Sequence, residues 1–177
     1  MKLIVIDMQK ALMDDELYNL DGLLENVPKL IRIARENRVE VIYVQHDAGP
    51  GTGFSVGDEA FEIADEVAPK AGESVFVKKA SSAFTNREFA AYLEAAKDET
   101  LMIVGLQTNF CIDATVKSAF ERGYDVIIPE GTNSTFDNDY MTGETTYNYY
   151  MNEVWPDLFA DCVTMDEAIE MIRKQNV

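Results

Sequence analysis

A buried apolar run leads directly into a helical pattern in the stretch Leu101-Met-Ile-Val-Gly-Leu-Gln-Thr-Asn-Phe-Cys-Ile-Asp-Ala-Thr115. Its first four residues form an unbroken apolar run, which is typical of a strand buried on both faces of a parallel sheet. A helical pattern follows from Asn109 to Arg122, so Cys111 lies directly after the strand and at the amino terminus of a helix. The stretch therefore predicts one strand-to-helix unit of an α/β protein with a cysteine at its turn.

Similar apolar runs recur on both sides of this unit, at Leu3–Ile6, Val39–Gln45, Ser74–Val77 and Tyr124–Ile128. Helical patterns separate them, at Leu23–Asn37, Asn86–Lys97 and Met165–Lys174, the last with Thr164 as its cap and Glu167 as its capping-box acid. Such alternation favours right-handed crossover units. We therefore expect a doubly wound, mostly parallel α/β sheet in a single domain spanning residues 1–177.

Composition narrows the class of protein. The 177 residues are 47% hydrophobic and carry a formal net charge of −17. No apolar run approaches the length of a membrane span or a signal-peptide core, and two cysteines, Cys111 and Cys162, are too few for a secreted disulfide framework. We expect a cytoplasmic protein that binds neither nucleic acid nor membranes, and whose partner is a small, preferably neutral substrate.

Candidate functional residues follow the strands, because ligands of doubly wound sheets bind beyond the carboxyl ends of their strands. Asp7 follows the first strand, His46 the second, Lys78 the third, and the segment Gly105–Cys111 the fourth. The glycine-rich segment 47–57 is predicted to be a loop that forms a wall or lid of the site.

Each residue also has a structural interpretation. Cys111 suits a small buried core position, Asp7 suits a turn cap, and Lys78 or Lys79 suits the solvated surface. The catalytic interpretation predicts a Cys111 thiol of low pKa, because helix amino termini and cations favour the thiolate. Such a thiol would alkylate faster than Cys162.

Taken together, the motifs resemble those of the isochorismatase-like cysteine hydrolases along nearly the whole chain. The opening strand of that family is similar to Val5-Ile6-Asp7-Met8-Gln9. Its Lys-x-x-x-Ser-Ala-Phe pattern matches Lys78-Lys-Ala-Ser-Ser-Ala-Phe84. This spacing selects Lys78 over Lys79 as the catalytic lysine that the resemblance implies. Gly105-Leu-Gln-Thr-Asn-Phe-Cys111 matches the nucleophile segment, with Thr115 at family-like spacing. The resemblance implies a three-layer fold, in which helices flank both faces of a mostly parallel sheet of about six strands.

The resemblance also implies an amidohydrolase that cleaves a C–N bond through a thioester. In it Cys111 is the nucleophile, Asp7 moves the proton, and Lys78 stabilises negative charge. A cis peptide bond is implied between Leu106 and Gln107, and an oxyanion hole from the backbone N–H groups of Gln107 and Cys111. The expected substrate pocket contains the side chains of Leu12, His46, Phe84 and Phe110. For His46, a bond to the loop backbone or a purely structural role stays open beside the pocket role.

Departures from the family pattern leave the substrate open. One histidine, His46, cannot supply the two-histidine metal set of nicotinamidases, so we expect neither a metal nor a cofactor. After the fifth strand, the segment Glu130-Gly-Thr-Asn-Ser134 stands where the family usually has Asp-Ala. Leu12 stands where the family usually has an aromatic residue after its Asp-Met-Gln motif. The aromatic-rich stretch from Tyr140 to Trp155 suits a pocket, a core helix or a subunit interface, and a homo-oligomer, dimer or tetramer, is expected.

Two other functions stay open beside the amidohydrolase. The same fold can cleave a different bond, such as an ether or an ester. It can also serve as a non-catalytic binding module, in which case Cys111 would show no special thiol reactivity.

Overall fold

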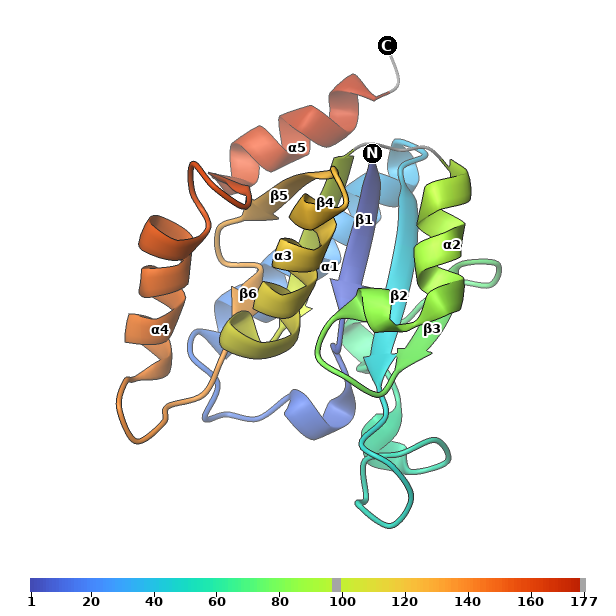
Figure 1. Ribbon diagram of the computed structural model, residues 1–177, viewed down its shortest axis with the longest axis vertical. Helices are drawn as coiled ribbons and strands as arrows, with labels where there is room; N and C mark the ends of the chain where they lie inside the picture. Colours follow the sequence, from blue (N-terminus) through green and yellow to red (C-terminus); the bar gives the residue numbers. More distant parts are fainter. Residues whose placement is uncertain (97–99, 176–177) are drawn as a thin grey trace.

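The computed structural model describes residues 1–96 and 100–175. Its described strands form one seven-stranded sheet, in the order β3-β2-β1-β4-β5-β7 with β6 also beside β4 (Figure 1). Every strand pair is parallel. The strands are β1 Lys2–Ile6, β2 Glu40–His46, β3 Ser74–Lys78, β4 Thr100–Leu106, β5 Asp125–Pro129, β6 Asn133–Ser134 and β7 Asp161–Val163. The predicted doubly wound parallel sheet is confirmed, with β6 and β7 in addition to the five predicted strands.

Helices cover both faces of the sheet, which gives three layers (Figure 1). The α-helices are α1 Leu20–Glu36, α2 Arg87–Ala96, α3 Asp113–Glu121, α4 Gly143–Tyr149 and α5 Met165–Lys174. Apolar side chains of α1 and α5 pack against one face, and those of α2 and α3 pack against the other. The central strand β1 is buried along its whole length, as expected of a strand covered on both sides.

Short helical turns connect these elements: η1 Lys10–Leu12, η2 Glu59–Phe61, η3 Asp65–Val67 and η4 Ala83–Thr85 are 3₁₀, whereas η5 Thr108–Ile112 and η6 Tyr150–Val154 are π-helical. The helix predicted from Asn109 is therefore η5 followed by α3, with Cys111 inside the π turn. The predicted α5 bounds and its Thr164–Glu167 capping box are confirmed. The last residue of the helix predicted over 86–97, Lys97, lies outside the described residues.

Strand order reverses between β1 and β4, which lie side by side in the middle of the sheet. Gly105 of β4 pairs with Ile6 of β1, at a φ of +120°. A Cβ at Gly105 would lie 2.0 Å from the Ile6 carbonyl oxygen, so only glycine fits here. This close approach places the residues that follow the two strands, Asp7 and the 107–111 turn, beside each other.

The aromatic stretch near the C-terminus divides between core and surface. Trp155 is fully buried, and its indole N–H donates to Asp113 Oδ1 at 3.0 Å. Met151 is also buried, whereas Tyr140 is 94% exposed. Core packing therefore accounts for the end of this stretch and leaves its beginning on the surface.

Among the described helices, none combines the length and the apolar character that a membrane crossing requires.

Candidate active site

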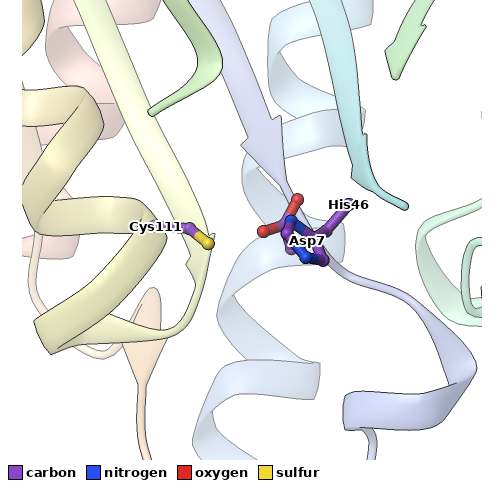
Figure 2. A group of neighbouring side chains, drawn as sticks. All are labelled: Asp7, His46 and Cys111. Atoms are coloured by element: carbon purple, nitrogen blue, oxygen red, sulfur yellow. The ribbon is translucent and has the colours of Figure 1, made fainter. Parts of the chain in front are cut away.

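The candidate residues converge at the carboxyl edge of the sheet. Asp7 directly follows β1, His46 ends β2, Lys78 ends β3, and Cys111 lies in η5 after β4. Figure 2 shows the Cys111 sulfur facing the Asp7 carboxylate, with the His46 ring beside Asp7. Ligand atoms of Asp7, His46 and Cys111 lie within 4.8 Å of one another. The fold thus brings together residues that are widely separated in the sequence.

The Lys78 ammonium lies at the centre of this group. Its Nζ donates to Asp7 Oδ2 at 2.7 Å and to Cys111 Sγ at 3.2 Å, and lies 3.2 Å from His46 Nδ1. The side chains of Lys78 and Asp7 are 0% and 1% exposed. An isolated buried charge is costly, so the pair and its hydrogen bonds are what make this burial tolerable.

The neighbouring lysine has a different environment. Lys79 is 77% exposed, and its Nζ lies 3.8 Å from the Asp47 carboxylate. Only Lys78 of the two therefore contacts Asp7 and Cys111, in keeping with the choice that the motif spacing made.

Burial dominates the protonation of the site. It raises the pKa of Asp7 even though the positive charge of Lys78 lowers it. Burial, aided by the negative charge of Asp7, raises the pKa of the Cys111 thiol to about 12. The expected low-pKa cysteine is therefore wrong: desolvation and the adjacent carboxylate outweigh the Lys78 cation, and the resting sulfur is a thiol. The pKa of Cys162 is also raised, to about 11.

Thr115 links the two motifs that carry Lys78 and Cys111. Its hydroxyl donates to the Cys111 carbonyl at 2.7 Å and accepts from the Ala83 N–H at 3.0 Å. Because Thr115 is buried, this contact fixes η4 and the segment after Lys78 against the start of α3. The Ser-Ala-Phe part of the lysine motif thus has a structural role beside the nucleophile.

The turn after β4 is held by residues that the sequence did not single out. The peptide bond between Leu106 and Gln107, for which the resemblance implied a cis geometry, is cis. Thr108 donates to Asn133 Oδ1 at 2.6 Å, and Thr135 donates to Asn109 Oδ1 at 2.7 Å. Asn133 lies in the segment 130–134 that departs from the family pattern, and Thr135 directly follows it, so this departure is the sequence signal that could have found them.

Gln9 is a second supporting residue that the sequence did not assign. It is fully buried, and its amide binds the backbone at His46 and Phe61. The Asp-Met-Gln motif contains Gln9, but no sequence pattern indicated that its side chain binds these backbone groups.

The four predicted pocket residues have different environments, and His46 is the one that contacts the Lys78 ammonium. Phe110 is 56% exposed and, with Gln107, lines a cavity of about 500 Å³ beside residues 107–111, which we call the nucleophile turn. Leu12 is partly buried and packs against the core of the α1 face. Phe84 is a correction: it is 6% exposed and packs on Phe89 and Tyr124, because α2 and α3 enclose it in the core.

Asp7, His46 and Cys111 offer the oxygen, nitrogen and sulfur ligands that a zinc ion accepts. The Lys78 ammonium, however, contacts all three of them. A metal ion at this point would have to displace a buried cation that already compensates the carboxylate. The arrangement therefore suits a proton-transfer and nucleophile site better than a metal centre.

Comparisons with known proteins identify the family of this chain. The family model described as the isochorismatase domain matches residues 2–155. The isochorismatase family protein YrdC of Bacillus subtilis is 29% identical over 94% of this chain and 93% of its own length. Ureidoacrylate amidohydrolase RutB of Rhizobium rhizogenes is 24% identical over 93% of this chain and 83% of its own.

Solved structures show the same fold. A structure described as a putative isochorismatase from Burkholderia xenovorans superposes with a TM-score of 0.89, at 25% identity, over 99% of this chain and 88% of the other. The family model covers most of the chain, including β1 to β6 and each of the four residues of the candidate site. This chain therefore belongs to the isochorismatase family of hydrolases.

Proposed function

We propose that the protein is a cysteine amidohydrolase that cleaves the C–N bond of a small, preferably neutral amide, ureide or carbamoyl compound. The observation that carries this proposal is the buried Lys78 ammonium, which hydrogen-bonds both to the Asp7 carboxylate and to the Cys111 sulfur. An ion pair with only a structural role would not need a thiol in contact with its ammonium group. The relative named as a ureidoacrylate amidohydrolase supports C–N hydrolysis as the reaction.

Asp7 is the proton acceptor in this mechanism. Its Oδ2 is bound to Lys78, and its buried Oδ1 has no hydrogen-bond partner among the described residues. As the sulfur attacks the substrate carbonyl carbon, the S–H proton passes to Asp7, and the Lys78 ammonium stabilises the negative charge. The high thiol pKa means that this transfer accompanies the attack instead of preceding it.

The tetrahedral oxyanion rests on the backbone N–H groups of Gln107 and Cys111, each worth about 3 to 4 kcal/mol in comparable sites. The C–N bond then breaks, and Asp7 returns its proton to the departing nitrogen. Water attacks the resulting Cys111 thioester, gives a proton to Asp7 and releases the acid. The proton finally returns to the sulfur, which restores the resting thiol.

Hydrolysis of candidate substrates, followed by formation of their products, tests the proposal. We would assay a panel of neutral amides, ureides and carbamoyl compounds, together with an ester and a vinyl ether, for the wild type, Cys111→Ala and Cys162→Ala. Cys162 is the matched control, because it is the other free cysteine and its thiol pKa is also raised by burial. We expect Cys111→Ala to lose turnover and Cys162→Ala to keep it.

The other functions predict different results. Turnover of only the ester or ether would assign another bond, and no turnover by the wild type would favour a binding module. Equal amide turnover by wild type and Cys111→Ala would remove the nucleophile from the mechanism.

A further inference from the structure

The third hydrogen-bond acceptor of Lys78 is His46. An ammonium group has three N–H donors, and Asp7 and Cys111 accept two of them. The third contact is to His46 Nδ1 at 3.2 Å. A nitrogen can accept this bond only through its lone pair, so Nδ1 carries no hydrogen and the ring hydrogen lies on Nε2.

The rest of the fold holds the backbone of His46 in register with Lys78. The two residues are directly paired between β2 and β3. The buried Gln9 side chain accepts from the His46 N–H at 2.7 Å and donates to its carbonyl at 3.1 Å. Gln9 also donates to Phe61 at 2.8 Å, and the Phe54 ring lies 6.0 Å from the imidazole. These bonds fix the backbone of His46, and its ring contacts the Lys78 ammonium and lies beside the Phe54 ring.

We propose that His46 is a positioning residue of the hydrolase: its neutral Nε2–H form holds the Lys78 ammonium between Asp7 and Cys111, and protonation of the ring releases that ammonium. Two adjacent cations repel each other, and an imidazolium offers no lone pair to Lys78. The catalytic consequence rests on the proposed function, whereas the tautomer and the position of Lys78 do not.

Charged groups around the His46 ring determine the pH at which the ring is protonated and the ammonium is released. The groups that face it are Asp7 directly after β1, Lys78 from β3, the thiol of Cys111 from η5, and Asp47 directly after its own strand β2. Burial and the Lys78 charge lower the pKa of His46, and the two carboxylates raise it by less. The ring is therefore neutral at pH 7, and the release falls at a pH below the ordinary histidine range of about 6.5.

The single histidine of the chain allows a direct test by NMR. In protein with ¹⁵N-labelled histidine, long-range ¹H–¹⁵N spectra report the tautomer and the pKa of one ring. We expect the Nε2–H tautomer and a pKa below 6.5, and we expect Lys78→Met to raise the pKa and remove the tautomer preference. The exposed neighbour variant Lys79→Met is the control and should leave both unchanged.

An Nδ1–H tautomer in the wild type, or the same spectrum in Lys78→Met as in the wild type, would overturn the proposal. These measurements do not depend on turnover. They therefore separate a failure of the His46 assignment from a failure of the proposed amidohydrolase activity.

Two substitutions test the consequence for reactivity. His46→Leu removes the acceptor, whereas the Oδ1 of His46→Asn can accept from Lys78 and does not titrate. We expect His46→Leu to slow turnover about tenfold, and His46→Asn to recover part of that loss. The wild-type log rate should fall more steeply with decreasing pH below the His46 pKa, and both variants should lack this break.

The pH profile of Cys111 alkylation by iodoacetamide gives the same readout if no amide substrate is found. A purely structural role would change the thermal unfolding temperature of the variants without removing the break in the profile. A break that persists in folded His46→Asn would contradict the proposal.

Discussion

The buried cation and the buried carboxylate of the site change the Cys111 thiol pKa in opposite directions. Lys78 lowers it, Asp7 raises it, and desolvation, the largest effect, also raises it. The position of Cys111 after a strand was evident from the sequence, but its pKa was not. Desolvation depends on how completely the surrounding elements enclose the sulfur, and no local pattern of residues reports that enclosure.

Asp7→Asn separates the reactivity of the thiol from catalysis. Removing the negative charge lowers the Cys111 pKa, so iodoacetamide alkylation at pH 8 should become faster. Amide turnover should fall by at least about 100-fold, because no group remains to move the proton. Asparagine suits this position, since Asp7 has a φ of +51° and asparagine tolerates the left-handed region. Slower alkylation in a folded variant would contradict this account of the pKa.

Among the helices and strands, the long periodic segments were predictable from the sequence and the short ones were not. The bounds of α5 and its capping box followed from apolar spacing and one Thr–Glu pair. In contrast, β6 has two residues and β7 has three, too few for any periodicity. The β6 pairing with Gly105 and Leu106 nevertheless supports the turn that carries Cys111. That part of the site depends on tertiary contacts, which sequence patterns do not report.

Gly105→Ala tests the close contact between β1 and β4. The added methyl group would meet the Ile6 carbonyl, and the φ of +120° is unfavourable for alanine. Overpacking and strain together should lower the free energy of unfolding by about 2 to 5 kcal/mol. Gly123→Ala is the matched control, because its φ is +84° and its Cβ would contact nothing within 4 Å. Urea denaturation of both variants measures the difference, and equal losses would rule out the steric contribution.

Thr164→Ala tests the capping box of α5. The Thr164 side chain accepts from the Glu167 N–H, and Glu167 accepts in return from the Thr164 backbone. Loss of this cap should reduce the free energy of unfolding by about 1 kcal/mol, as for other N-caps. Because α5 packs with α1 against one face of the sheet and supplies none of the four candidate site residues, the kcat of the variant should not change. A change in kcat would imply that α5 influences the site.

The net charge of −17 over the whole chain favours neutral substrates. The cavity beside the nucleophile turn is also lined by Asp137 and Asp139. The nearby cation Lys78 is buried and already bound to Asp7, and the exposed Lys79 lies next to Asp47. No exposed basic cluster among the residues that line this cavity offsets the acidic field.

This field predicts how salt affects the reaction. For a substrate with a carboxylate, kcat/KM should rise several-fold as the ionic strength increases from about 0.01 M to 0.3 M, because the screening length falls from about 30 Å to below 8 Å. A neutral amide of similar size is the control, and its kcat/KM should stay constant. Steady-state kinetics on the two substrates measure the effect. If salt slowed the reaction of the anionic substrate alone, an attractive cationic subsite would have to exist, and the preference for neutral compounds would be wrong.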